Sequence, residues 1–543
     1  MEQKKNSLVN VINMQIFTAP AIALVAFICW GVFAPENFNK VSNMLLGGAC
    51  KYFTWFMAPV VTGMFVFCMW AAFSKYGNIR LGGSDAKPRL GFVPWFSIAL
   101  TAGTGAGLCF FGAYQPIQIF NNMPAFENPK NLTDAVLLSF QWTYLQWTVH
   151  PYSIYTACGV VMAFLYYNTK RRYRASELFY GVAGDKVEGR FGDVIDSIAV
   201  YLIVIGVAVT MGYSTLQTSR GLNVLFDIPS NAKTWLLVLG GFTIFYTAAA
   251  ITGIDKAVAF ISSANMYLYY WIAIWAFVFV DPLNIMGLVF TSAGAYISNF
   301  IRLSLELEPV AQSGFIASNP IFIYCWWALF APIMGMFLIK LAYGRTIRQF
   351  VLVNLIAPVI FSFFWFTWLG GSAIFIDIFR NGTIYKAISS VGSDVSLYVL
   401  CDYLPFPYLM KIVSFLIVVF SFITLGQALA VAIASMTARE YQDVDGLTKP
   451  PSVLVMFWAA IMMGVTYIML AAGGMAALQA SAVVWGFPIL IAMCFMMYGH
   501  VKCMMNLKEY DKTGDYHYLN EDPALLMAQA NKMMAQANNK EQA

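Results

Sequence analysis

Residues 322–335 read FIYCWWALFAPIMG, an apolar run that holds two adjacent tryptophans. A helix turns by ~100° per residue, so Trp326, Phe330 and Met334, which follow one another at intervals of four, form one stripe along its surface. Such a stripe could be the wall of a cation-binding site. It could equally face lipid or pack in the protein core, so the surrounding sequence has to separate these alternatives.

The composition is that of a membrane protein. Of the 543 residues, 60% are hydrophobic and 11% are charged, which is too apolar for a soluble domain with a wetted surface. The net charge of +5 is small, and the basic residues are spread over short loops. We therefore expect a polytopic protein that has the lipid bilayer as a partner and no nucleic acid.

The sequence offers little for catalysis. Nine cysteines are scattered without a CxxC pair or a His/Cys cluster, so we expect reduced thiols and neither a metal nor another cofactor. A polytopic membrane enzyme would need clustered ionisable groups at membrane depth, whereas His150, His500 and His517 are far apart. A sensor that binds without translocation is a further alternative, but we expect no signalling domain. These features favour a protein that is not an enzyme.

Apolar stretches of about 18 residues or more predict membrane-spanning helices. Twelve stretches qualify: 15–34, 52–73, 92–120, 136–167, 192–219, 234–252, 257–280, 316–343, 347–371, 404–437, 450–474 and 480–504. Several are longer than a bilayer requires, so tilted or interrupted helices are expected.

The loop charges alternate as the positive-inside rule requires for twelve spans. Segments 4–5, 75–89, 170–174 and 345–348 are rich in Lys and Arg, whereas loop 121–134 holds one lysine. We therefore expect a multi-pass protein of the inner (cytoplasmic) membrane with both termini in the cytoplasm. Residues 291–307 are moderately apolar and amphipathic, so this segment is expected to lie along the membrane surface.

Residues 101–107 read TAGTGAG in the middle of the third predicted span. Gly103, Gly105 and Gly107 each weaken a helix by ~1 kcal/mol relative to alanine, so the backbone can unwind here. Unwound backbone in a membrane must be buried in protein or line a cavity, and its N–H groups could hold a carboxylate. The alternative is a small-residue face for close helix packing.

The eighth predicted span has its own expected break, at Pro332 and Gly335. Interrupted helices five spans apart are typical of an inverted repeat, in which the substrate binds at the repeat interface near the membrane midplane. Further short motifs accompany these breaks: KYG at 75–77, KP at 87–88, Gly112 with Pro116, LQ at 216–217, GIDK at 253–256 and GRTIR at 344–348. In this order they resemble the betaine/carnitine/choline transporter (BCCT) family over about residues 15–505.

The resemblance implies an all-α, LeuT-like fold, with twelve transmembrane helices in a five-plus-five inverted repeat preceded by two extra helices. The expected division is a cytoplasmic tail (1–14), two peripheral helices (15–91), the first repeat (92–280), a periplasmic amphipathic surface helix (281–315), the second repeat (316–505) and a cytoplasmic tail (506–543). It also implies a homotrimer that uses the surface helix, and alternating-access transport of quaternary-ammonium zwitterions of the betaine or carnitine type.

The aromatic box of the family falls here on Trp147, Trp326, Trp327 and Phe330, the last at a position where a tryptophan is usual. A quaternary ammonium cannot donate hydrogen bonds, so aromatic faces are its best partners, each worth ~1–2 kcal/mol when desolvated. With these rings, the substrate-binding residues implied are Met334, Gln118 and the glycines at 103, 105 and 107.

Three further positions depart from the family's pattern. Its Glu-Pro-x-Tyr motif reads QPIQ at 115–118, so the amide of Gln118 replaces one aromatic wall, and Asn319 stands where a tryptophan is usual. These changes leave room for a differently substituted or more polar zwitterion.

The ion-site positions favour transport without sodium. Sodium needs several oxygen ligands, but the family's TSADS run reads TLGQA at 424–428, which leaves Thr424 as an ion-site remnant. Met334 matches a methionine of sodium-independent carnitine/γ-butyrobetaine exchangers, although core packing would also explain it. Asn265 stands where those exchangers carry an arginine. We expect sodium-independent antiport, with a sodium-coupled betaine or choline symporter as the alternative.

Overall fold

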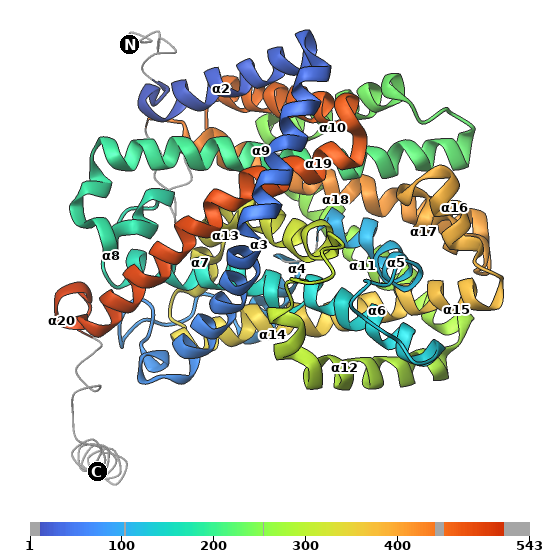
Figure 1. Ribbon diagram of the computed structural model, residues 1–543. Helices are drawn as coiled ribbons and strands as arrows, with labels where there is room; N and C mark the ends of the chain where they lie inside the picture. Colours follow the sequence, from blue (N-terminus) through green and yellow to red (C-terminus); the bar gives the residue numbers. More distant parts are fainter. Residues whose placement is uncertain (1–10, 103–104, 253–254, 440–449, 515–543) are drawn as a thin grey trace.

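The chain folds as a bundle of long helices joined by short turns (Figure 1). The computed structural model describes residues 11–102, 105–252, 255–439 and 450–514. The helices of these residues confirm the all-α fold. They are α2 (Met14–Phe33), α3 (Pro35–Phe73), α4 (Phe92–Ala102), α5 (Ala106–Asn121), α6 (Leu132–Trp147), α7 (Val149–Tyr167), α8 (Tyr180–Ala183), α9 (Arg190–Phe226), α10 (Ala232–Thr252), α11 (Asp255–Val280), α12 (Pro282–Leu305), α13 (Phe322–Ala342), α14 (Ile347–Trp365), α15 (Gly371–Phe379), α16 (Thr383–Val391), α17 (Ser396–Asp402), α18 (Pro407–Met436), α19 (Ser452–Met505) and α20 (Leu507–Tyr510).

Within the described residues, ten helical segments are long and apolar enough to cross a membrane. The chain is therefore a polytopic membrane protein, as its composition predicts. The ten segments are Met14–Phe33, Pro35–Phe73, Leu132–Tyr167, Arg190–Phe226, Ala232–Thr252, Val258–Val280, Ala317–Ala342, Ile347–Phe379, Pro407–Met436 and Ser452–Met505.

The ten segments differ in number from the twelve predicted spans for two reasons. The third predicted span is divided into α4 and α5, each too short to qualify alone. The last two predicted spans are joined in the 54-residue α19, whose backbone is non-helical at Gly473 and Gly474. Gly474 has φ 58° and ψ −133°, which a residue without Cβ adopts most readily. The twelve-span count and the inverted repeat remain predictions.

The predicted break at Pro332 and Gly335 is wrong, because α13 runs through both residues. Proline removes one backbone hydrogen bond, which a helix buried among other helices tolerates. Gly335 instead allows α13 to lie close to α7, since an added Cβ would come within 2.8 Å of Met162 Sδ and 3.1 Å of Cys158 Sγ. The irregular part of this segment lies earlier, in a π-helical turn at Ala317–Ile321.

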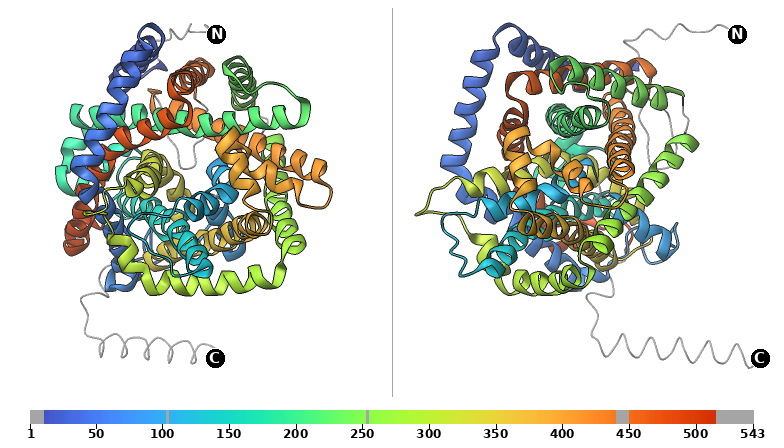
Figure 2. Two further views of the ribbon diagram at one scale, coloured as in Figure 1. Left: turned by 45° about the vertical axis from the view of Figure 1, so that its right-hand side comes forward. Right: turned by 90° about the vertical axis from the view of Figure 1, so that its right-hand side faces the viewer.

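The most deeply buried helices are α7, α9 and α13, and α13 packs against both of the others at the centre of the bundle. α2 and α3 lie on its outside (Figure 2). α12 also lies at the outer edge (Figures 1 and 2). It begins at Pro282, earlier than the amphipathic segment predicted at 291–307, and exposes Leu283, Phe290, Ile297 and Ile301.

The short helices mark two ends of the bundle, with α8 and α20 at one end and α16 and α17 at the other (Figure 1). Three of the predicted basic segments meet at the first end, which we call the basic end. Arg80 Nη1 donates to the carbonyl of Gly344 over 2.8 Å, and the side chain of Asn168 accepts from Gly82 N and donates to Arg80 O.

The C-terminal segment is also anchored at the basic end. Asn168 Nδ2 donates to Asp511 Oδ2 over 3.3 Å and to Thr513 Oγ1 over 3.4 Å, and Lys512 N donates to Asn168 O over 2.9 Å. One side chain therefore ties the end of α7, the loop after α3 and the residues that follow α20.

At the opposite end an ion pair joins distant parts of the sequence. Arg220 Nε of α9 lies 2.9 Å from Asp394 Oδ2 in the turn between α16 and α17. Burial raises the pKa of the Asp394 carboxyl above its ordinary value, and the guanidinium of Arg220 partly offsets this effect. The pair therefore links α9 to the α16–α17 region through a carboxylate whose ionisation depends on its partner.

Candidate functional site

The glycine-rich run does interrupt a helix. α4 ends at Ala102 and α5 begins at Ala106, and Gly105 between them is extended, with φ −130° and ψ 179°. Gly103 lies outside the described residues. Gly107 sits in the first turn of α5, where an added Cβ would be 3.0 Å from Cη2 of Trp326 and 3.4 Å from Cη2 of Trp147. The run therefore combines an interrupted helix with a close approach of two indole rings to the backbone.

Around Gly107 the rings of Phe111, Trp147, Tyr213, Trp326 and Trp327 form what we call the aromatic cluster. The ring centroids of Trp147 and Trp326 are 6.3 Å apart at an interplanar angle of 89°, and those of Trp147 and Trp327 are 6.5 Å apart at 76°. Phe111 lies 5.0 Å from Trp147 and 6.1 Å from Trp326. The cluster thus brings together α5, α6, α9 and α13.

Trp147 is placed by the break between α6 and α7. Thr148 has non-helical φ −120° and ψ −111°, and Pro151 follows three residues later without the N–H that would bond the carbonyl of Trp147. The Trp147 side chain is 1% exposed, and its indole Nε1 is buried without a hydrogen-bond partner. A donor in this state is available to an oxygen of a bound molecule.

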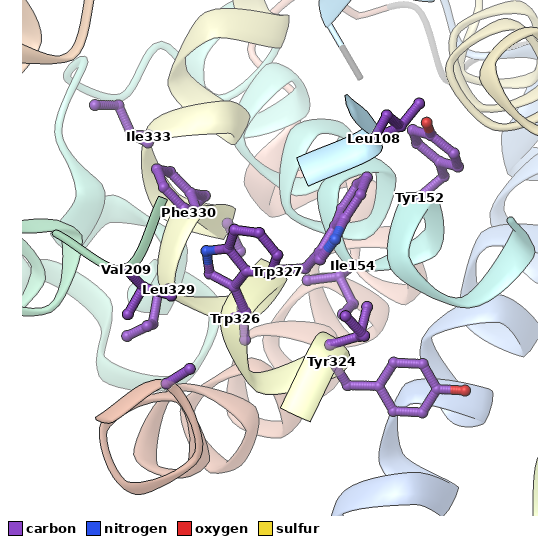
Figure 3. Packing of buried hydrophobic residues seen from close by; sticks show 14 of the residues in the cluster. Leu108, Tyr152, Ile154, Val209, Tyr324, Trp326, Trp327, Leu329, Phe330 and Ile333 are labelled. Carbon is purple, nitrogen blue, oxygen red and sulfur yellow. The ribbon is translucent and has the colours of Figure 1, made fainter. Parts of the chain in front are cut away.

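The two span-eight tryptophans face different neighbours. Trp326 lies 5.2 Å from Tyr213, and its Nε1 donates to Thr210 Oγ1 over 3.1 Å, which fixes the ring against α9. Trp327 lies 4.6 Å from Tyr155 and 5.0 Å from Tyr152, both on α7. Figure 3 shows the adjacent tryptophans on α13, with Phe330 further along the same helix.

Phe330 and Met334 continue the predicted stripe away from the aromatic cluster. Phe330 is 8% exposed and packs against α9, where a Cβ on Gly206 would be 3.3 Å from its Cε2. Met334 is partly buried against the core. The stripe predicted from helical spacing is therefore present, and only its tryptophan takes part in the aromatic cluster.

Gln118 lies away from the aromatic cluster. It is on α5 with Gly107, and the helical rise separates the two residues by roughly 16 Å. Gln115 Nε2 instead donates to Gln118 Oε1 over 3.4 Å and to Asn319 Oδ1 over 3.0 Å. Three residues that depart from the family's pattern therefore meet in one amide cluster: Gln115, Gln118 and Asn319.

A second polar network lies beside the helix break. Tyr269 of α11 donates to the carbonyl of Gly105 over 3.2 Å, and its hydroxyl is 3.0 Å from Ser421 Oγ of α18. Asn265 Nδ2 donates to Ser421 Oγ over 2.9 Å. These contacts fill the space between the broken helix and α18 with neutral side chains.

Thr424, the predicted remnant of an ion site, bonds within its own helix. Its hydroxyl donates to the carbonyl of Phe420 over 2.9 Å and to that of Ser421 over 3.2 Å. Over the described parts of the chain, no group of three or more His, Cys, Asp and Glu is placed to hold a metal ion.

The sequence did not single out Phe111, Tyr152, Tyr155 or Tyr213. Phe111 follows Gly107 by four residues and so shares its face of α5. Tyr152 and Tyr155 likewise share one face of α7 at a spacing of three residues. Tyr213 lies within an apolar helix, and its role emerges only when α9 is packed against α5 and α13.

A polytopic bundle with a buried, uncharged aromatic cluster beside an interrupted helix has the organisation of a secondary transporter. The sequence model for the BCCT, betaine/carnitine/choline family transporter, matches residues 15–509, and the chain belongs to this family. It is a multi-pass membrane transporter and not an enzyme. The family recognised from the short motifs is thus confirmed.

Curated relatives match the chain over most of their length. A "Probable glycine betaine transporter" of Desulfitobacterium hafniense is 29% identical over 91% of this chain and 97% of its own length. The "Ectoine/hydroxyectoine transporter" of Virgibacillus pantothenticus is 27% identical over 90% of this chain and 96% of its own. The "Osmo-independent choline transporter BetT1" of Acinetobacter baylyi is 26% identical over 91% and 93%.

Proposed function

We propose that the protein transports a quaternary-ammonium zwitterion of the betaine or carnitine type by alternating access, with the aromatic cluster as the binding site. The observation that carries the proposal is the unpaired indole N–H of Trp147 within that cluster of neutral rings. The ring faces attract the cationic end of the substrate. The Trp147 N–H and the backbone of the glycine-broken helix are suited to its carboxylate.

The binding site is tested by substitution of one ring. Replacement of Trp327 by leucine removes a cation–π partner worth ~1–2 kcal/mol, so the Kd for glycine betaine or carnitine should rise about 5- to 30-fold. The matched control is Trp55→Leu, because Trp55 is an exposed residue of α3. Equal affinity of Trp327→Leu and wild-type protein in a calorimetric titration would count against the aromatic cluster as the site.

We further propose sodium-independent antiport. Its support is the network of Asn265, Tyr269 and Ser421 beside Gly105. The hydroxyl of Thr424 adds to this support, because it donates to carbonyls of its own helix. A sodium site would need several of these oxygens to direct their lone pairs at one ion, whereas here they bond to one another and to backbone carbonyls. Sodium-coupled symport of betaine or choline is the competing proposal. The relatives include named transporters of glycine betaine and of choline, so both substrates remain open.

Counterflow in proteoliposomes separates the two mechanisms. Vesicles are preloaded with unlabelled betaine, carnitine or γ-butyrobetaine, and uptake of labelled substrate is measured with sodium or potassium on both sides. Antiport predicts that preloading accelerates uptake equally in the two salts. A further set of vesicles has sodium on the outside alone, and uptake that requires this inward gradient and is not accelerated by preloading would establish symport in its place.

The orientation and assembly belong to the same proposal. We place the basic end and both termini in the cytoplasm, because this end gathers the Lys- and Arg-rich loops. The exposed apolar residues of α12 are offered as the contact of a homotrimer. Accessibility of single engineered cysteines tests the orientation, and the mass of the protein–detergent complex tests the oligomeric state.

A further inference from the structure

A cavity of about 350 Å³ opens at the basic end, where two membrane-crossing helices finish together. One wall is the 3₁₀ turn after α3 (Lys75–Asn78), and the other is the end of α19 with α20. Its lining residues come from these two segments, which are distant in the sequence: Lys75, Tyr76, Met504, Met505, Asn506, Leu507, Lys508 and Glu509.

The polar part of the cavity is cationic. Lys75 and Lys508 line it from opposite walls, and both are exposed at the surface. Glu509 is the acidic member of the lining, and Lys502 adds an exposed positive charge near the end of α19. Two ammonium groups from separate walls are suited to a phosphate group, which offers several acceptor oxygens to donors on either side.

The cavity also has an apolar flank. Next to it the lipid-facing surfaces of α3 and α19 expose large side chains, with Phe73 and Tyr498 each 66% exposed and Met505 70% exposed. Because both helices belong to the segments that can cross a membrane, their shared end lies at the boundary between hydrocarbon and water. A ligand with a charged head and an apolar tail would fit this boundary, whereas a free anion would use its polar part alone.

The position of Lys508 is fixed by the fold. α20 follows α19 after one residue, Leu507 is buried, and Asp511 just beyond α20 accepts a hydrogen bond from Asn168. The two lysines are therefore presented by segments that are tied to the bundle on both sides. A site made in this way is organised before its ligand arrives, which lowers the entropic cost of binding.

We propose that this cavity binds the phosphate-bearing headgroup of an anionic phospholipid in the leaflet that surrounds the basic end. Lys75 and Lys508 hold the phosphate, and the acyl chains lie along Phe73, Tyr498 and Met505. Each lysine is expected to contribute roughly fivefold to the affinity for an anionic lipid. This proposal is independent of which substrate the aromatic cluster takes.

The test measures lipid binding to the purified full-length protein without any transport assay. Native mass spectrometry counts phosphatidylglycerol and phosphatidylcholine molecules retained by wild-type protein, by Lys75→Gln, by Lys508→Gln and by the double variant. Preferential retention of phosphatidylglycerol should fall roughly fivefold in each single variant and further in the double variant. The control is Lys386→Gln, which removes an exposed lysine from α16 at the opposite end.

Two further arms make every outcome decisive. Glu509→Gln removes the opposing charge and should strengthen phosphatidylglycerol retention, so it tests the site even where the lysine variants fold poorly. Glycerol phosphate added in solution should compete only weakly, because it lacks acyl chains. The proposal is overturned if the double variant retains phosphatidylglycerol as wild type does, if Glu509→Gln leaves retention unchanged, or if glycerol phosphate displaces the lipid at equal concentration.

Discussion

Replacement of Gly107 by alanine tests whether the aromatic cluster is built around that glycine. The new Cβ would lie 3.0 Å from Trp326 Cη2 and 3.4 Å from Trp147 Cη2, and the first distance is shorter than ordinary van der Waals contact. Both rings are nearly inaccessible to solvent and packed on their other sides, so they cannot move away freely.

The expected change in stability is the balance of two opposing effects. Glycine to alanine stabilises a protein by ~0.4–1 kcal/mol through the unfolded chain wherever the new Cβ fits. Overpacking of a dense core costs ~1–3 kcal/mol. Gly105 supplies the matched control, because its φ of −130° is open to alanine and a Cβ there would meet no atom within 4 Å.

We expect Gly105→Ala to keep or slightly raise the thermal stability of the purified protein. We expect Gly107→Ala to be less stable than Gly105→Ala by the equivalent of ~1–3 kcal/mol. Substrate affinity of Gly107→Ala should fall as well, because the tryptophans are displaced. The assay is a thermal-shift series with a range of substrate concentrations, in which a bound ligand raises the transition. Equal transitions for the two variants would refute the role assigned to Gly107.

Three further perturbations address other parts of the molecule. Asn319→Ala removes the shorter of the two hydrogen bonds that the buried Gln115 Nε2 donates and leaves the 3.4 Å contact to Gln118 Oε1, so it should cost ~0.5–1.5 kcal/mol. The double variant Asn319→Leu/Gln115→Leu should recover part of that loss in the same thermal-shift assay. Arg220→Gln removes the positive charge that lowers the pKa of Asp394, so this pKa should rise further above its value in the unfolded chain. A carboxyl group whose pKa is raised in the folded state makes the free energy of unfolding fall as the pH rises through that pKa. The variant should therefore lose more stability at pH 7 than at pH 5, and the further substitution Asp394→Asn should abolish this difference between the two pH values. Asn168→Ala removes the side-chain bonds to Asp511 and Thr513 and keeps the backbone bond to Lys512, so trypsin should cut at Lys512 faster than in wild-type protein, and an unchanged rate would contradict the anchoring role of the side chain.

The membrane class and most helices can be predicted from the sequence, because the length of an apolar run is visible along the chain without knowledge of the helices that pack against it. The run 192–219, predicted from hydropathy alone, falls within α9, and the run 404–437 extends three residues before and one residue beyond α18. The interruption between Ala102 and Ala106 can also be predicted from the sequence, since closely spaced glycines weaken the local preference for a helix.

The failures come from contacts between helices. Pro332 has the local signature of a break, yet α13 continues because its neighbours compensate for the lost hydrogen bond. The motif position does not reveal that Gln118 bonds to Gln115, and a role of Gln118 in substrate binding stays a prediction. Nothing in the local sequence marks Tyr155 as a site residue, because its position is defined by its contact with Trp327 on another helix. Apolar periodicity identifies which face of a helix is buried and leaves its partner undetermined.

The kink at Gly473 and Gly474 bears on how the protein is made. A straight helix as long as α19 would measure ~81 Å, well over twice the hydrocarbon thickness of ~30 Å, so its two arms must diverge at these glycines. Asn39 of α3 donates to the carbonyl of Ala472 and anchors the corner from outside. No loop separates the arms, so we expect them to enter the bilayer together as a helical hairpin.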